Sequence, residues 1–361
     1  MNILICPLDW GLGHASRCIP IIKLLHQSGH KVTIAGQGRS LLMLQKEFPH
    51  LDSIPIIGFS PSYPKSGKLI IHLFCLLPKF IFSLVSDYRQ LKSILNNQQF
   101  DLVISDNRYG LWNRKTKNIL ITHQIMVKVP RLFRFAEYPV HLVSKLMINL
   151  FDECWIPDHT KGPGLSGDLS HKYPLPQNAR FIGSLSRFAD EDISLKTKNK
   201  SEEILAVISG PEPQRSIFEA ILTHQLVKLG RPATLVGGTP ESNRRSSKIS
   251  NLTIIPFLES EELKNKIHTA AIVICRSGYS SIMDLSALGA KALFVPTPGQ
   301  TEQEYLAKMF HEEGIAMHST QDSLDLDSDI DKALVFKGFS NNQSPQLLLN
   351  VIQDLQTNNV S

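Results

Sequence analysis

Residues 272–305 read IVICRSGYSSIMDLSALGAKALFVPTPGQTEQEY, and this stretch decides the fold. Its apolar start predicts a short buried strand at 272–275, and the loop of small residues that follows leads into a helix beginning near Ile282. A second apolar run at 292–295 predicts the next strand. Strand, helix and strand within so short a distance are typical of a parallel βαβ unit.

The same alternation extends from this stretch towards both ends of the chain. In the second half, a helix is predicted at 216–229 and further strands at 204–209, 233–236 and 252–256. In the first half, strands are predicted at 2–7, 30–35, 54–57, 102–105, 119–122 and 154–156, with an extended segment at 180–185. We therefore expect an α/β protein with two Rossmann-like, doubly wound domains that face each other across a cleft.

A polar segment separates the two halves. Residues 189–203 contain almost no large apolar side chains, as expected for a linker. We predict an N-terminal domain at 1–187, a linker at 188–202 and a C-terminal domain at 203–361. Two domains of this size suit a chain of 361 residues.

Charge and cysteine content narrow the class of protein. Residues 1–186 carry 21 Lys and Arg against 11 Asp and Glu, a net +10, whereas the remainder has 17 against 22, a net −5. This asymmetry favours an anionic partner for the first half, and the lack of basic runs argues against nucleic acid. Five scattered cysteines and a start without a basic segment predict a protein of the reducing cytoplasm, with no disulfide framework and no signal peptide.

The first strand is followed by the turn GLGHASR at 11–17. Gly11 and Gly13 allow a ligand to approach the backbone closely, and His14 lies where a helix should begin. The turn departs from the dinucleotide fingerprint GxGxxG, and the predicted strand at 30–35 is followed by Gly36 rather than a carboxylate, which disfavours NAD. His14 is a candidate for acid–base chemistry, and the alternative is a capping or loop histidine.

Two further turns carry polar residues at predicted helix starts. The turn at 209–215 offers Gly210 and Arg215 to a phosphate, although a plain rigid turn is the alternative. The loop after strand 272–275 contains small and hydroxyl residues that suit a diphosphate, and Asp284 follows one helical turn later, where it can accept hydrogen bonds from ribose hydroxyls. The loop at 296–304 is rich in side chains that can hydrogen-bond sugar hydroxyls.

The run from Cys275 to Tyr305 resembles the donor-site signature of family-28 glycosyltransferases of the GT-B fold. The lipid II-forming N-acetylglucosaminyltransferases are the best-known members of that group. The turn GLGHASR is similar to the GxGH loop in the N-terminal domain of those enzymes. The resemblance covers both halves in the right order, and residues 57–175 match only in pattern.

The resemblance implies a UDP-sugar donor bound mainly by the second domain, without a metal. It assigns Phe257 and Leu258 to the base, Asp284 to the ribose and Gln303 to the donor sugar. It assigns to the diphosphate Ser277, Gly278, Ser280 and Ser281. Three departures point to a member other than the peptidoglycan enzyme: Asp284 stands where the family has Glu, Glu304 replaces a glutamine, and a Gly-rich loop is replaced at 210–213.

Transfer with inversion needs a base for the acceptor proton and a stabiliser for the departing UDP. We expect His14 to be the base and Asp106, at the end of a strand in the same domain, to orient it. The alternative for Asp106 is to cap the next turn. Arg276 or Arg215 is expected to stabilise the diphosphate. The acidic segment 325–331 lacks the glycine and final glutamate of a calcium loop, so no metal site is predicted.

Two segments of the first half combine apolar and basic residues. Residues 69–85 are the most apolar stretch, and 127–146 carry two lysines and two arginines among aromatic and aliphatic residues. They fit a peripheral contact with the anionic inner face of the cell membrane, where a lipid-linked or cell-envelope glycan acceptor would be reached. Ordinary buried helices flanked by Lys and Arg give the same pattern.

Two other functions fit the same fold. A UDP-sugar 2-epimerase also uses two such domains, but it needs several acid–base groups around one sugar, and His14 alone stands near the predicted cleft. A non-catalytic nucleotide-sugar binding protein would bind UDP without turnover.

Overall fold

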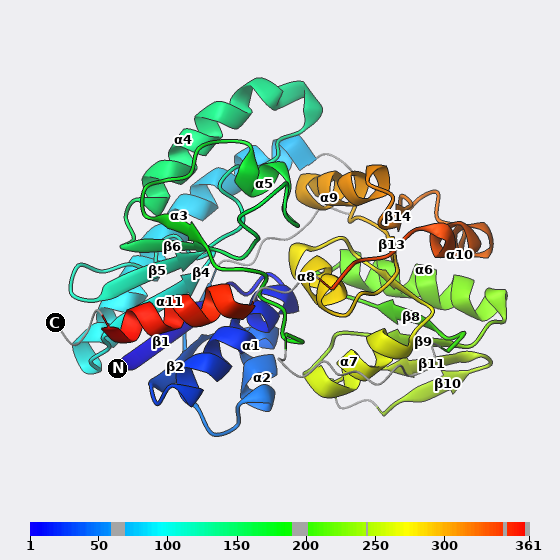
Figure 1. Cartoon of the computed structure of the whole chain (residues 1–361), viewed down its shortest axis with the longest axis horizontal. Helices are drawn as coiled ribbons and strands as arrows, with labels where there is room; N and C mark the ends of the chain where they lie inside the picture. Colours follow the sequence, from blue (N-terminus) through cyan, green and yellow to red (C-terminus); the bar gives the residue numbers. More distant parts are fainter. Residues whose placement is uncertain (59–68, 190–200, 243–244, 342–344, 358–361) are drawn as a thin grey trace.

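Two seven-stranded sheets organise the chain into units that lie side by side (Figure 1). The computed structural model describes residues 1–58, 69–189, 201–242, 245–341 and 345–357, and the side chains of 69–77 and 131 are outside this description. Most of the predicted linker, residues 190–200, also lies outside the described residues. The predicted α/β architecture of two Rossmann-like units is confirmed.

The first sheet has the strand order β3-β2-β1-β4-β5-β6-β7, and all its strand pairs are parallel. Its strands are β1 (Asn2–Pro7), β2 (Lys31–Gly36), β3 (Asp52–Pro55), β4 (Leu102–Asp106), β5 (Lys117–Ile121), β6 (Glu153–Ile156) and β7 (Ala179–Phe181). The central strands β1 and β4 are buried along nearly their whole length, because helices cover both faces of a parallel sheet.

The second sheet has the order β10-β11-β9-β8-β12-β13-β14, and only β10 pairs in the antiparallel sense. Its strands are β8 (Ile204–Val207), β9 (Ala233–Val236), β10 (Ser247–Ile249), β11 (Leu252–Ile255), β12 (Ile272–Cys275), β13 (Ala292–Phe294) and β14 (Met317–His318). The edge strands β10 and β14 had no counterpart in the sequence prediction, because both are short and only partly apolar.

Helices connect successive parallel strands in both units. The first unit contains α1 (Leu12–Gln27), α2 (Gly38–Glu47), α3 (Leu69–Asn97), the 3₁₀ helix η1 (Arg131–Ala136), α4 (Glu137–Ile148) and α5 (Asp168–His171). The second contains α6 (Gln214–Leu229), α7 (Ser260–Thr269), α8 (Tyr279–Ala287), α9 (Thr301–Glu312) and α10 (Leu326–Val335). No helix within the described ranges is long and apolar enough to cross a membrane.

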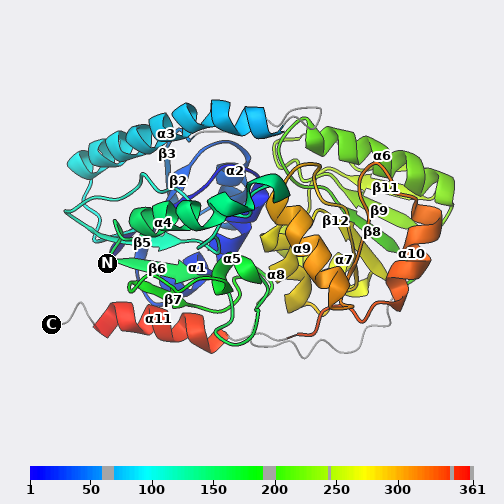
Figure 2. The ribbon, with the colours of Figure 1, turned by 90° about the horizontal axis from the view of Figure 1, so that it is seen from above.

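The last helix, α11 (Pro345–Thr357), returns to the first unit (Figure 1). It lies on the opposite side of that unit from α3 (Figure 2). Its Asp354 carboxylate is 2.8 Å from a guanidinium nitrogen of Arg180, the middle residue of β7. The last helix of the predicted C-terminal domain therefore lies against the first sheet. The two units also share one continuous apolar core, in which residues of α1 and α8 are both buried.

Candidate active site

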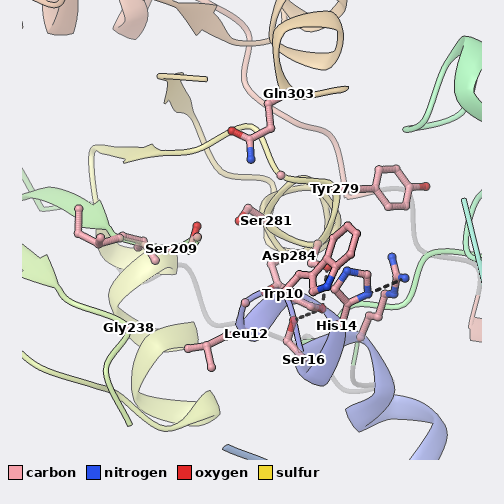
Figure 3. A pocket seen from close by; sticks show the side chains of 18 of the residues that line it. Trp10, Leu12, His14, Ser16, Ser209, Gly238, Tyr279, Ser281, Asp284 and Gln303 are labelled. Carbon is pink, nitrogen blue, oxygen red and sulfur yellow. Dashed lines mark hydrogen bonds between the residues drawn. The ribbon is translucent and has the colours of Figure 1, made fainter. Parts of the chain in front are cut away.

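A cavity of about 250 Å³ lies between the two units, at the carboxyl ends of their central strands. Its walls come from the loops after β1, β4, β5, β8 and β12 and from the start of α9. The predicted site residues that line it are Gly11, Gly13, His14, Gly210, Phe257, Leu258, Gly278, Ser280, Ser281, Asp284 and Gln303. Residues singled out in both halves of the sequence therefore share one cavity (Figure 3).

His14 lies in the first turn of α1, and the helix begins directly after Gly11, whose backbone conformation only glycine adopts easily. Gly11 has a φ of 128°, in the region that side chains disfavour. The Nδ1 atom of His14 is 3.0 Å from Oδ2 of Asp106, which is the last residue of β4. The predicted pairing of these two residues is thus present, because the ends of adjacent parallel strands meet at one edge.

Arg17, one helical turn after His14, binds the same carboxylate. Its Nε atom is 2.9 Å from each carboxylate oxygen of Asp106, its Nη2 atom also contacts Oδ1, and Nη2 is 2.9 Å from Nδ1 of His14. Arg17 is 1% exposed and Asp106 fully buried. The carboxylate therefore neutralises a buried cation and holds a histidine at the cavity wall.

The charges of this cluster oppose one another. Burial alone would raise the pKa of Asp106, but the Arg17 guanidinium and then His14 outweigh burial and hold that pKa below its usual range. Burial and then the Arg17 charge lower the pKa of His14, and Asp106, which raises it, does not bring it back to its usual value. His14 is thus held in its neutral form, in which one ring nitrogen can accept a proton.

On the opposite wall, the start of α8 faces the cavity. The first N–H groups of a helix lack intrahelical partners, and a Cβ atom added at Gly278 would meet nothing within 4 Å. The hydroxyl of Ser280 donates to the Gly13 carbonyl across the cleft at 2.7 Å, and that of Ser277 donates to the Gln303 carbonyl at 2.8 Å. These two hydroxyls are therefore already engaged, whereas Ser281 lines the cavity.

Gln303 is oriented by the loop before α9. Its side-chain oxygen accepts a hydrogen bond from the Thr297 backbone at 2.8 Å. The amide nitrogen points into the space above Ser281 (Figure 3). Its NH₂ group is therefore directed at whatever occupies this part of the cavity.

Asp284 is tied to the segment that leaves the first unit. Its carboxylate accepts hydrogen bonds from the Ser186 hydroxyl at 2.8 Å and from Nε of Arg187 at 3.1 Å. Burial raises the pKa of Asp284 more than Arg187 lowers it. Arg187 also lines the cavity and brings a cation to the wall next to α8.

Four predicted donor-site residues do not line the cavity. Arg276 is 1% exposed, donates to the Val295 and Pro296 carbonyls at 3.0 Å, and burial lowers its pKa to about 9. Arg215 is bound to two glutamates of its own unit. Glu304 is exposed and accepts from a loop backbone, and Ser277 is turned away as described above.

A line of polar contacts joins the two units beside His14. Oε1 of Glu302, in the first turn of α9, is 2.9 Å from Nε2 of His123. Nδ1 of His123 is in turn 3.2 Å from Nη1 of Arg17. The His123 ring stacks on Tyr279 of α8, with centroids 4.1 Å apart.

A second cavity, of about 460 Å³, lies between α3 and α4. Its walls are mainly apolar, with Phe80 and Leu84 from α3 and Val140, Val143 and Met147 from α4. Three residues of the loops after β1, β4 and β5 line both this cavity and the first: Trp10, Asn107 and Gln124. The two cavities therefore meet next to His14.

Apolar side chains are exposed around this second cavity. Phe82 of α3 is 73% exposed, and Leu132 and Phe135 of η1 are both 78% exposed. Further exposed apolar residues on these elements are Ile81, Val85, Tyr138, Leu142, Val143 and Leu146. Such a concentration on one face of a protein marks an interaction surface.

Sequence reasoning missed Trp10, Arg17, His123, Arg187 and Glu302, all of which line the first cavity. Arg17 stands in the GLGHASR turn, and His123 directly follows the predicted strand at 119–122. A rule that examines every residue after a parallel strand would have found His123. Arg187 carries no local sequence signal.

Residues 205–356 match the C-terminal domain of glycosyltransferase family 28. An uncharacterized glycosyltransferase of Methanosarcina acetivorans is 26% identical over 331 residues, which cover 87% of this chain and 84% of the relative. The UDP-N-acetylglucosamine–N-acetylmuramyl-(pentapeptide) pyrophosphoryl-undecaprenol N-acetylglucosamine transferase of Desulforudis audaxviator is 39% identical over 69 residues, 19% of this chain and 18% of that enzyme.

Solved structures share the whole architecture. The glycotransferase of kitacinnamycin superposes with a TM-score of 0.64 at 13% identity, covering 99% of this chain and 95% of that one. MurG of Acinetobacter baumannii superposes with a TM-score of 0.54 at 14% identity, covering 98% and 99%. At these identities the likeness is one of fold.

Proposed function

We propose that this chain, whose residues 205–356 match the C-terminal domain of glycosyltransferase family 28 and whose fold is that of GT-B glycosyltransferases, transfers a hexose or N-acetylhexosamine from a UDP-sugar to an acceptor hydroxyl with inversion. The observation that carries this proposal is the His14–Asp106 pair in the cleft wall opposite the start of α8. A base for the acceptor and an anion site for the donor thus face the same small cavity.

The donor side is supported by the order of groups along the cavity. Phe257 and Leu258 offer apolar contact to a base, and the start of α8 with Ser281 suits a diphosphate. The Gln303 amide is directed at the position of a sugar. Arg187, rather than the buried Arg276, is the cation placed to meet the negative charge of departing UDP. The 69-residue match to a UDP-N-acetylglucosamine transferase favours uracil as the base.

In the proposed step, an acceptor oxygen attacks the anomeric carbon of the sugar and the bond from that carbon to the diphosphate breaks. The acceptor proton moves to Nε2 of His14 in the tautomer whose Nδ1–H donates to Asp106. Arg17 only donates, so its contact with the same Nδ1 atom is a hydrogen bond in the other tautomer alone, and the step requires Asp106 to hold the hydrogen on Nδ1. The electron pair of the broken bond leaves with UDP, which the α8 N–H groups and Arg187 stabilise. Attack from the face opposite the leaving group inverts the anomeric centre.

The acceptor side is supported by the second cavity. It meets the first at Trp10 and Asn107, and its apolar walls suit the non-polar body of a lipid-linked acceptor or of another amphipathic glycan. The exposed apolar side chains of η1 and α4 would then rest on an anionic membrane surface, with basic residues such as Arg134 and Lys145 nearby in the chain.

The direct test measures release of UDP from a panel of UDP-hexoses and UDP-N-acetylhexosamines, with and without an extract of membrane lipids as acceptor. Turnover should fall by about 10²–10⁴-fold in His14→Gln, because a general base contributes that much. His224→Gln, on the exposed face of α6, is the matched control. If His14→Gln kept a tenth or more of the wild-type turnover, His14 would not be the general base.

The same assay separates the other candidates. An epimerised sugar formed without acceptor would identify a 2-epimerase, and UDP binding without turnover a nucleotide-sugar binding protein. Among the described residues, no group of three or more His, Cys, Asp or Glu is placed to hold a metal ion. We propose metal-independent transfer, which predicts unchanged rates in EDTA.

A further inference from the structure

Glu302 and His14 lie at the two ends of one continuous line of hydrogen-bonding groups. From Glu302, the line passes through His123 at 2.9 Å and Arg17 at 3.2 Å to Asp106 at 2.9 Å and His14 at 3.0 Å. Glu302 belongs to the second unit and the other four to the first. The line therefore crosses the cleft at the site of the proposed reaction.

The protonation of each member follows from its partners. A guanidinium only donates, so Nδ1 of His123 accepts from Arg17 and its Nε2–H donates to Glu302. His123 is thus a neutral bridge, and Arg17 is a cation between two carboxylates, one direct and one reached through this bridge. The Gln124 amide also donates to Glu302, which fixes the second carboxylate oxygen.

We propose that Glu302 is a positioning residue that sets the basicity of His14 from across the cleft. This rests on the proposed role of His14 as the base. Glu302 stands one residue before Gln303, so α9 places its carboxylate in the line to Arg17 together with the side chain directed at the donor sugar.

The sign of the effect follows from the charges. Arg17 lowers the affinity of His14 for a proton, and a carboxylate near Arg17 and His14 offsets that influence. Burial raises the pKa of Glu302, but His123 and then Arg17 and His14 outweigh burial and hold that pKa below its usual range. Removing the carboxylate must therefore lower the pKa of His14.

The charged and titratable groups around this line come from five elements or loops. They are Arg17 and Cys18 on α1, Asp106 on β4, His123 after β5, Tyr279 on α8 and Glu302 on α9, together with His14 itself. Burial keeps the Cys18 thiol and the Tyr279 hydroxyl protonated, because it raises both pKa values. Neither of them can replace the Glu302 charge.

Contacts around the start of α9 show that Glu302 is held in place by more than its own hydrogen bonds. The Thr301 hydroxyl donates to the Lys128 carbonyl of the first unit at 2.7 Å, and the Tyr305 hydroxyl accepts from the Asp168 backbone at 2.7 Å. Exchange of the Glu302 charge alone should therefore leave the docking of α9 intact.

The test is Glu302→Gln in the full-length protein, with Glu302→Asp as the charge-preserving variant. Glu312→Gln is the matched control, because Glu312 is exposed at the far end of the same helix. The pKa of His14 is measured by NMR titration of ¹³C-labelled histidine, with the His14 signal identified by its loss in His14→Gln. The pH dependence of UDP release from the UDP-sugar turned over in the activity assay is the second readout.

Glu302→Gln should lower the His14 pKa, and move the acidic limb of the rate profile to lower pH, by roughly half a unit to one unit. Glu302→Asp and Glu312→Gln should leave the His14 pKa and the position of the acidic limb within about 0.2 pH unit of the wild-type values. UDP affinity, measured calorimetrically, should not change.

A His14 titration that is identical in Glu302→Gln and wild type, or absent in both, would overturn the proposal. So would a raised KM for the UDP-sugar with an unchanged rate profile, which would make Glu302 a ligand of the donor sugar. The NMR readout needs no substrate. Failure of the proposed function, seen as no turnover of any UDP-sugar, is therefore distinguishable from failure of this inference.

Discussion

Replacement of Asp106 by asparagine tests the centre of the proposed site, because it keeps the shape of the side chain and removes its charge. The carboxylate is fully buried and binds both Arg17 and His14. In Asp106→Asn, the Arg17 cation remains buried without its direct counter-charge, and the imidazole loses the acceptor that orients it. The variant should therefore lose both stability and activity.

The loss of stability can be estimated from the burial of the pair. Breaking a buried ion pair by removing one partner costs about 3–5 kcal/mol, because the remaining charge is uncompensated. Arg17 is 1% exposed, so solvent provides little compensation. For a unit of this size, each kcal/mol lowers the melting temperature by about 2–4 °C, which gives a shift on the order of 10 °C.

The pH dependence of this difference has a definite sign. The folded-state pKa of Asp106 lies below its usual value, so the ionised carboxylate stabilises the fold fully above the ordinary Asp range of about 4. That contribution is lost as the pH falls further, through the folded-state pKa. The wild type should therefore exceed Asp106→Asn in stability at pH 7, and the two should converge in acid.

Differential scanning calorimetry at several pH values from about 2 to about 7 measures the difference, because this range includes the titration of a carboxyl group whose pKa lies below the ordinary Asp value. Asp52→Asn is the control, because Asp52 is 70% exposed and 3.7 Å from Lys31, an ion pair that contributes little. Turnover should also fall by about 10²-fold or more, because His14 loses its fixed orientation. A melting temperature within about 2 °C of wild type would refute the view that Asp106 compensates a buried Arg17.

Three further outcomes are expected. Arg187→Gln should lower kcat for the UDP-sugar by about 10-fold or more in steady-state kinetics, although the buried Arg276 is still present. An unchanged kcat would show that Arg187 does not stabilise the leaving group. Leu84→Trp should fill the second cavity and raise KM for the acceptor without changing UDP affinity. An unaltered KM for the acceptor would show that the acceptor binds elsewhere. The double variant Phe82→Ser, Leu132→Ser should sediment less with anionic vesicles at low salt than the wild type does. Its melting temperature should be nearly unchanged, because both side chains are exposed. Vesicle binding equal to that of the wild type would exclude this surface as the membrane contact.

Local sequence patterns were enough to predict the architecture. Short apolar runs such as 2–7 and 272–275, each followed by small polar residues and a helical pattern, predict parallel strands whose carboxyl ends carry the site. The glycines at 11, 13 and 278 mark the turns that lead into α1 and α8, and all three line the cavity. These signals depend on a few consecutive residues, so no long-range information is needed to read them.

Only the tertiary structure decided which polar residues meet. Arg17 and Asp106 are 89 residues apart in the chain, and Glu302 is 179 residues from His123. Arg276 looks equally suited to a diphosphate in sequence, but its guanidinium turns inward, where the Val295 and Pro296 carbonyls and the Gln321 side chain accept its hydrogen bonds. Strand ends converge in every doubly wound sheet, but the distance between two side chains depends on how both units pack. A pattern read along the chain does not contain that distance.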